Sequence, residues 1–173
     1  LYHLEENDLG PVYGHQWRFW NASYFNCHTH YHNKGIDQLN NIICDLKKNN
    51  FSRRLIMTAW NPEQIDEMAL PPCHVLSQFH VNDKYELSCS LYQRSGDVGL
   101  GIPFNILSYS FLTCLIAHHC NLNRGEFIHH IGNAHIYENH INTLEQQITL
   151  EPYDFPKLYI KNKRCIQYYD RRI

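Results

Sequence analysis

The apolar residues of the chain form two kinds of pattern, one typical of helices and one typical of strands. Residues 36–48 carry five Ile and Leu side chains at helical spacing, with two lysines at the end of the segment. This periodicity predicts an amphipathic helix, and cations near its C-terminus favour the helix dipole. Short apolar runs rich in β-branched or aromatic residues predict strands. The predicted strands cover residues 54–60, 75–81, 86–94, 126–132 and 157–161.

Two further segments have helical character. Residues 104–121 form a long apolar segment that we expect to be a largely buried helix, and residues 139–148 have the spacing of an amphipathic helix. The order of helices and strands is mixed, so the predicted fold class is α+β, or mixed α/β. The most apolar run, residues 104–117, contains Asn, Ser and Thr and is expected to be too short to span a bilayer.

The length and charge of the chain limit its function. The chain has 173 residues, which suits one domain with a sizeable core. Its 15 Lys and Arg residues against 17 Asp and Glu residues give a formal net charge of −2. We therefore expect no general attraction to nucleic acid or to an acidic membrane surface, and any anion site has to be local.

The cysteines and histidines bear on the compartment and on metal binding. Seven cysteines at irregular spacing, without a C-x-x-C pair, fit reduced thiols in a cytosolic protein. The thirteen histidines include the segment "CHTHYH" at 27–32 and a group at 129–140. Neither has the paired ligand spacing of a zinc site, so no metal is expected.

The segment "LPPCHVLSQF" at residues 70–79 holds a cysteine in a stiff part of the chain. Pro71 and Pro72 fix the backbone φ before Cys73 and remove two backbone donors. A rigid corner beside His74 suits a nucleophilic thiolate, although buried inert cysteines are common. The local pattern leaves both alternatives open.

Five sequence blocks together resemble the thymidylate synthase family. They are "GPVYG" at 10–14, "SRRLIMTAWNP" at 52–62, "MALPPCH" at 68–74, "QRSGDVGLGIPFN" at 93–105 and "HIYENH" at 135–140. The resemblance implies a mixed β-sheet covered by helices on one face, with two such sheets packed back to back in a dimer. We expect residues 1–173 to be a single catalytic domain that lacks the family's N-terminal third and its C-terminal end.

This resemblance implies a catalytic group around Cys73. Cys73 matches the nucleophile that attacks C6 of the uracil ring of deoxyuridine monophosphate (dUMP). A free thiol with a pKa of about 8.5 is mostly protonated at neutral pH. Arg94 matches an arginine whose permanent charge can stabilise the thiolate and bind the substrate phosphate. Tyr13 matches the tyrosine that helps to remove the C5 proton.

The resemblance also implies a phosphate site that two chains share. Arg94 and Ser95 match residues that bind the phosphate in their own subunit. Arg53 and Arg54 match an arginine pair that reaches across the dimer to the phosphate of the other subunit. We therefore expect a homodimer with shared active sites.

The remaining matched residues are implied to bind the base, the sugar and the folate. Asn105 can donate to O4 and accept from N3–H of uracil, whereas an aspartate there would suit cytosine. His135 and Tyr137 match the pair that holds the 3′-hydroxyl of the deoxyribose, and Asp97 matches the carboxylate that binds the pterin ring. Asn105 is therefore expected to make the site selective for uracil.

The implied function is reductive methylation of dUMP to dTMP. The co-substrate is 5,10-methylenetetrahydrofolate, and dihydrofolate is the by-product. Two alternatives stay open: a pyrimidine-nucleotide hydroxymethylase of the same superfamily, and a truncated homologue that only binds nucleotide or protein. A cytoplasmic location and a fused or neighbouring dihydrofolate reductase domain agree with this interpretation.

Overall fold

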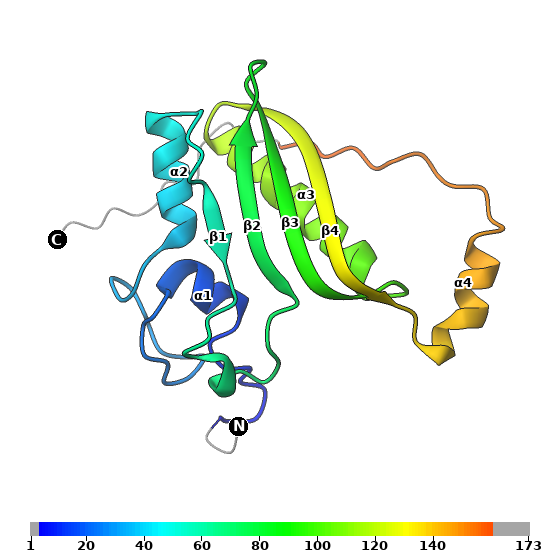
Figure 1. Ribbon diagram of the computed structural model, residues 1–173, viewed down its shortest axis with the longest axis horizontal. Coiled ribbons are helices and arrows are strands. Elements are labelled where there is room, and N and C mark those ends of the chain that lie inside the picture. Colours follow the sequence, from blue (N-terminus) through cyan, green and yellow to red (C-terminus); the bar gives the residue numbers. More distant parts are fainter. Residues whose placement is uncertain (1–3, 161–173) are drawn as a thin grey trace.

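A mixed four-stranded sheet forms the centre of the fold (Figure 1). The computed structural model describes residues 4–160. β1 pairs antiparallel with β2, and β2 pairs antiparallel with β3, whereas β4 runs parallel to β3. The predicted mixed α/β class and mixed sheet are confirmed. In sheet order the strands are β1 (Ile56–Thr58), β2 (His74–Val81), β3 (Glu86–Asp97) and β4 (Asn123–His135).

Helices join the strands in the described part of the chain. α3 connects β3 to β4, because a parallel pair needs a long crossover. α2 begins where the Asp37 side chain accepts the N–H of Asn40, which confirms the predicted helix to within two residues at its start. The helices are α1 (Tyr13–Phe19), α2 (Gln38–Lys48), α3 (Gly101–His119) and α4 (Ile141–Gln147), with short 3₁₀ helices η1 (Ile65–Glu67) and η2 (Glu138–His140).

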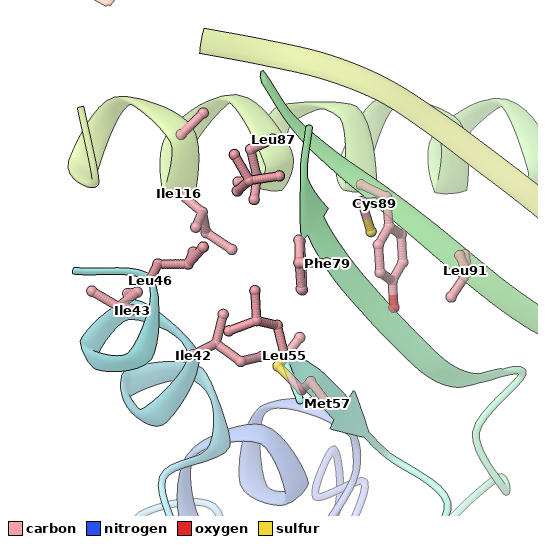
Figure 2. Packing of buried hydrophobic residues seen from close by; sticks show 13 residues of the cluster. Ile42, Ile43, Leu46, Leu55, Met57, Phe79, Leu87, Cys89, Leu91 and Ile116 are labelled. Carbon is pink, nitrogen blue, oxygen red and sulfur yellow. The ribbon is translucent and has the colours of Figure 1, made fainter. Parts of the chain in front are cut away.

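The core lies between the sheet and the helices α2 and α3. Figure 2 shows apolar side chains from both layers meeting there. Phe79 of β2 and Leu87 and Leu91 of β3 are fully buried on this face, since alternate strand residues point to the same side of a sheet. Ile42 from α2 and Ile116 from α3 close the core from the helix side. This packing fixes both helices on one face of the sheet.

Several predicted boundaries differ from the structure. The strands predicted at 75–81, 86–94 and 126–132 are confirmed and lie within longer strands, but only Ile56–Thr58 of the predicted strand 54–60 is a strand. The predicted strand 157–161 is wrong for residues 157–160, which form neither helix nor strand, and residue 161 lies outside the described residues. Leu158 and Ile160 instead line a cavity beside the end of α3 and the start of β4.

The prediction that residues 104–121 are largely buried is wrong. Tyr109, Ile116 and Ala117 are buried, whereas Phe104 and Leu107 are about two thirds exposed. One stripe of α3 packs on the sheet. An unbroken run of hydrophobic residues does not reveal which side of the helix the sheet will cover. The 19-residue helix is long and apolar enough to cross a membrane by length and composition. These two properties do not separate a membrane span from a core helix.

The segment predicted as a helix at 139–148 lies apart from the sheet. It divides into η2 and α4, neither of which has a buried residue. In Figure 1, α4 extends to the side beyond the end of β4. The apolar stripe of this helix therefore has no part in the core of the described residues.

The first helix, α1, follows a turn that only glycine fits. Gly10 has φ +77°, and a Cβ atom there would lie 2.2 Å from the Glu67 carbonyl oxygen. The Asp8 carboxylate accepts the N–H of Gly10 and fixes the turn from the other side. This turn aims α1 so that Tyr13, at its first position, reaches the chain in front of β2.

Candidate active site

Cys73 lies at a corner directly before β2, and Tyr13 holds this corner. The Tyr13 hydroxyl oxygen accepts the backbone N–H of Cys73 at 2.8 Å and that of His74 at 3.4 Å. The Tyr13 and His74 rings lie 5.0 Å apart. The two predicted catalytic residues, Cys73 and Tyr13, are therefore brought together by α1 and the start of β2.

Arg94 holds the same corner from β3. Its Nε donates to the Pro72 carbonyl and its Nη2 to the Pro71 carbonyl, both at 2.9 Å. The backbone N–H of Arg94 donates to the Cys73 carbonyl, and the guanidinium lies 5.6 Å from the centre of the Trp60 ring. Arg94 thus places a permanent positive charge beside Cys73 and uses two of its donors to fix the Pro-Pro backbone.

Asn105 belongs to a partly buried polar network centred on the buried Gln93. It lies on the first turns of α3, and its Oδ1 accepts from Gln93 Nε2 at 2.9 Å. Gln93 Oε1 lies 2.8 Å from His129 Nε2. The Asn105 side chain also hydrogen-bonds to the His74 ring. The network therefore links Asn105 to the residue beside Cys73.

Tyr13 and His74 at this corner are held in their neutral forms. Burial raises the pKa of Tyr13, against the opposing effect of the N–H groups of His74 and Cys73. Burial lowers the pKa of His74, and its hydrogen bond with Asn105 only partly offsets this. A neutral phenol and a neutral imidazole can each donate or accept a proton beside Cys73.

Asp97 occupies the turn between β3 and α3. Burial favours its neutral form, but hydrogen bonds from the backbone N–H groups of Gly99, Gly101 and Leu100 outweigh this and lower its pKa. His140 Nδ1 lies 3.7 Å from the Asp97 carboxylate. A fixed anion at this turn is suited to a ligand with N–H groups, such as the pterin ring that the resemblance implies. A cavity of about 460 Å³ beside it, lined by Leu100 and Leu144 among others, offers apolar walls for such a ring.

His135 and Tyr137 lie at the end of β4, next to Asp97. His135 is opposite Asp97 in the parallel register, and its carbonyl accepts the N–H of Val98. The rings of His135 and Tyr137 lie 5.3 Å apart. Ser95 lies between Arg94 and the end of β3. The structure thus brings these four predicted residues to the same end of the sheet as Cys73.

Arg53 and Arg54 lie at the opposite end of the sheet. They precede β1, whose Ile56 pairs with Gln78 and whose Thr58 pairs with Leu76. Because the pairing is antiparallel, the start of β1 lies near the end of β2, whereas Cys73 precedes its beginning. Both arginines are exposed. The structure does not bring them to the Cys73 of their own chain.

Three residues of this site carry no catalytic signal in the sequence pattern. Gln93 reads as an ordinary strand residue, Trp60 as the end of an apolar run, and His129 as one of several clustered histidines. Gln93 and His129 meet only because β3 and β4 are parallel, which local periodicity does not reveal. Among residues 4–160, no group of three or more His, Cys, Asp or Glu could hold a metal.

Comparisons with known proteins show which sequences this chain is similar to. The sequence profile described as thymidylate synthase matches residues 2–173. The chain is 55% identical over 166 residues to the bifunctional dihydrofolate reductase-thymidylate synthase of Paramecium tetraurelia, which covers 96% of this chain and 36% of that protein. It is 55% identical over 160 residues to the thymidylate synthase of Equine herpesvirus 2, and this match covers 92% of this chain and 55% of that protein.

A third relative gives a similar result. Thymidylate synthase 1/2 of Encephalitozoon cuniculi is 53% identical over 159 residues, with 92% of this chain and 54% of that protein covered. The chain therefore spans between about a third and about half of the length of these relatives. The family profile extends over almost all of the chain, and the matched region includes every residue of the Cys73 corner. The chain belongs to the thymidylate synthase family.

Proposed function

We propose that the protein containing this chain is a thymidylate synthase that converts dUMP to dTMP. The observation that carries the proposal is the rigid mounting of Cys73, whose backbone N–H donates to Tyr13 and whose preceding prolines are held by the Arg94 guanidinium. A rigid thiol with a cation held against the preceding residues suits covalent catalysis, whereas an inert core cysteine does not need such a mounting. Family membership and the named relatives support this reaction over other uses of the same fold.

The chemistry of the proposed reaction follows from what each group can do. Cys73 as thiolate forms a bond to C6 of uracil, and the electron pair of the C5–C6 double bond makes C5 nucleophilic. 5,10-methylenetetrahydrofolate supplies the methylene carbon and the hydride and leaves as dihydrofolate. Tyr13, whose hydroxyl lies against the Cys73 N–H, helps to take the C5 proton. Loss of Cys73 from C6 then restores the ring.

The binding roles follow the positions of the remaining residues. Arg94 and Ser95 bind the phosphate, and Asn105 reads the base by donating to O4 and accepting from N3–H. His135 and Tyr137 hold the 3′-hydroxyl of the sugar. The Asp97 carboxylate, fixed by three backbone N–H groups, binds the pterin ring of the folate.

The phosphate site is completed by a second copy of the chain. Arg53 and Arg54 lie too far along the sheet to serve their own Cys73, because the register places them at its other end. A two-fold dimer that packs the uncovered sheet faces back to back carries residues of one chain into the site of the other. Exposed side chains on that face, Ile56 and Tyr92 among them, support this packing.

The surroundings of the enzyme follow from the resemblance and the composition. We place the protein in the cytoplasm, with no membrane and no general nucleic-acid partner, in agreement with its net charge of −2. The relatives named bifunctional dihydrofolate reductase-thymidylate synthase make a fused or neighbouring dihydrofolate reductase domain a further expected partner.

The test uses the full-length protein with dUMP labelled with tritium at C5. Released tritium, dTMP and dihydrofolate are measured together after addition of 5,10-methylenetetrahydrofolate. Equal amounts of all three support a thymidylate synthase. Tritium release without dihydrofolate identifies a hydroxymethylase, and dUMP binding without any release identifies a non-catalytic homologue.

A further inference from the structure

We propose that His129 is a positioning residue which, through Gln93, fixes the orientation of the Asn105 amide and so favours uracil over cytosine. The inference rests on the proposed function, in which Asn105 reads the base. It concerns a histidine to which the family resemblance assigned no role.

Gln93 stands in the middle of the network and is almost completely buried, at 2% exposure. Its Nε2 donates to the Ser95 carbonyl and to Asn105 Oδ1, both at 2.9 Å. Its Oε1 lies 2.8 Å from His129 Nε2. All polar atoms of the Gln93 side chain therefore have partners on β3, β4 and α3.

The Ser95 carbonyl decides the direction of every hydrogen bond in this network. A carbonyl oxygen only accepts, so the amide nitrogen of Gln93 must face it and the amide oxygen must face His129. His129 Nε2 then has to carry a hydrogen. Since the second N–H of Gln93 goes to Asn105 Oδ1, a flipped Asn105 would set two donors against each other.

The orientation of Asn105 matters because an asparagine can read either pyrimidine. With its oxygen toward N3 and its nitrogen toward C4, it accepts from N3–H and donates to O4 of uracil. When flipped, the same amide donates to N3 and accepts from the N4 amino group of cytosine. The residue type alone therefore does not select the base, whereas a fixed orientation does.

His129 supplies the contact that keeps Gln93 in place. The parallel register sets it opposite Leu91, on the face that bears Gln93, and its ring lies 5.2 Å from the Phe127 ring. Without the His129 donor, the buried Oε1 of Gln93 has no partner. Rotation of the amide would set this oxygen against the Ser95 carbonyl, so we expect the whole Gln93 side chain to shift toward another donor. A shifted Gln93 no longer donates to Asn105 Oδ1.

The test compares three variants of the full-length protein. His129→Leu removes the donor, and His129→Gln places an amide nitrogen close to the position of Nε2. His130→Leu is the matched control, since His130 is exposed on the opposite face of β4. Any effect of that face on phosphate binding is common to both nucleotides and cancels in the ratio of their dissociation constants. Dissociation constants of dUMP and of the cytosine analogue dCMP are measured by calorimetry at neutral pH.

We expect the ratio of the dCMP to the dUMP dissociation constant to fall about tenfold in His129→Leu. It should return to within about threefold of wild type in His129→Gln and stay unchanged in His130→Leu. An unchanged ratio in His129→Leu, or equal weakening of both nucleotides, overturns the proposal and leaves His129 with a packing role only.

Two controls keep the outcome clear. If His129→Leu fails to fold, His129→Phe removes the donor with an aromatic ring that can still pack on Phe127, and the same ratio decides. If the wild-type protein does not bind dUMP, the proposed function fails and this inference falls with it. If only the inference fails, the variant without the His129 donor still binds dUMP and keeps the wild-type ratio of dissociation constants.

Discussion

At the end of the sheet where β3 and β4 finish, polar side chains are held by hydrogen bonds to the backbone, whereas at the other end Arg53 and Arg54 lie exposed in front of β1. Arg94 binds two proline carbonyls, and Asp97 accepts backbone N–H groups of the following turn. The backbone N–H of Arg54 donates to the Ser52 hydroxyl, but among residues 4–160 no hydrogen bond or ion pair holds the guanidinium group of Arg53 or Arg54.

This difference indicates which side chains of the site are already ordered before a ligand arrives. At the Cys73 end, folding already orders the side chains. Ligand binding there therefore costs little further side-chain entropy. Long exposed arginines lose rotamer freedom only when they meet an anion or a second chain. We therefore expect substitutions at the two ends to differ in kind: one end sets the chemistry, and the other contributes to phosphate binding in a neighbouring subunit.

The largest expected effect is loss of turnover in Cys73→Ser at the ordered end. We expect the rate of dTMP formation to fall about a thousandfold or more, because a hydroxyl is far less nucleophilic than a thiolate at neutral pH. The thermal unfolding midpoint should stay close to that of wild type. The dUMP analogue with fluorine at C5 should give a covalent adduct on Cys73 by mass spectrometry in wild type only. Substantial turnover in the variant would remove Cys73 from the mechanism.

Asn105→Asp should change which base the ordered end accepts. A carboxyl group reverses one of the two hydrogen bonds that the amide offers to uracil. We expect the preference for dUMP over dCMP to fall about a hundredfold or more, since a mismatched buried donor or acceptor is left unpaired. Dissociation constants of both nucleotides measure the change. Equal discrimination in the variant and wild type would show that another residue reads the base.

The exposed end is tested by mixing two inactive variants. Cys73→Ser and the double variant Arg53→Ala/Arg54→Ala are combined under conditions that exchange subunits. Each mixed dimer contains one site with an intact Cys73 and intact arginines from its partner. About a quarter of wild-type activity should therefore return if exchange is statistical and sites act independently. Activity that stays at the level of the separate variants after proven exchange would mean that the arginines serve their own chain.

The smallest effect is a pH dependence of stability at the ordered end. His15 of α1 is buried, and its Nε2 lies 3.0 Å from the Ala22 carbonyl oxygen. Burial lowers its pKa from 6.5, although the Ala22 carbonyl opposes this. Below about pH 6.5 the unfolded chain binds more protons than the folded chain, so the free energy of unfolding falls as the solution becomes more acidic.

The His15→Gln variant separates this contribution from others. Its amide nitrogen can still donate to Ala22 but does not titrate in this range. Urea unfolding at pH 7.5 and pH 5.5 should show a smaller loss of stability in the variant than in wild type. Equal losses in the two proteins would show that His15 titrates alike in the folded and unfolded chains.

The sequence predicts which residues gather at the ordered end better than it predicts how the helices are covered. Cys73, Arg94 and Asp97 lie in quoted motifs, and the structure brings them to one end of the sheet. The exposed side of α3 was not predicted, because a run of apolar residues such as Phe104 and Leu107 reports composition and not what covers it. The failure at residues 157–160 has a related cause, since a strand forms only where it pairs with the edge of a sheet.

The network of Gln93 and His129 lies beyond the reach of local patterns. The two side chains meet through a parallel register in which Leu91 faces His129, across the whole of α3 in sequence. Alternation along either strand predicts which residues point inward but not which strands are neighbours. α1 was missed for a different reason: its segment "YGHQWRF" is mostly aromatic and polar, and such residues contribute little to an apolar stripe.

The crossover through α3 also bears on how the domain reaches its native state. β2 and β3 are joined by a short hairpin connection at residues 82–85, whereas β4 pairs with β3 only after the chain has passed through α3. Closing the longer connection costs more chain entropy and delays the contacts that depend on it. We therefore expect the hairpin side of the thiol corner, where the Arg94 N–H donates to the Cys73 carbonyl, to form ahead of the contacts of His129 and His135, which wait for the crossover.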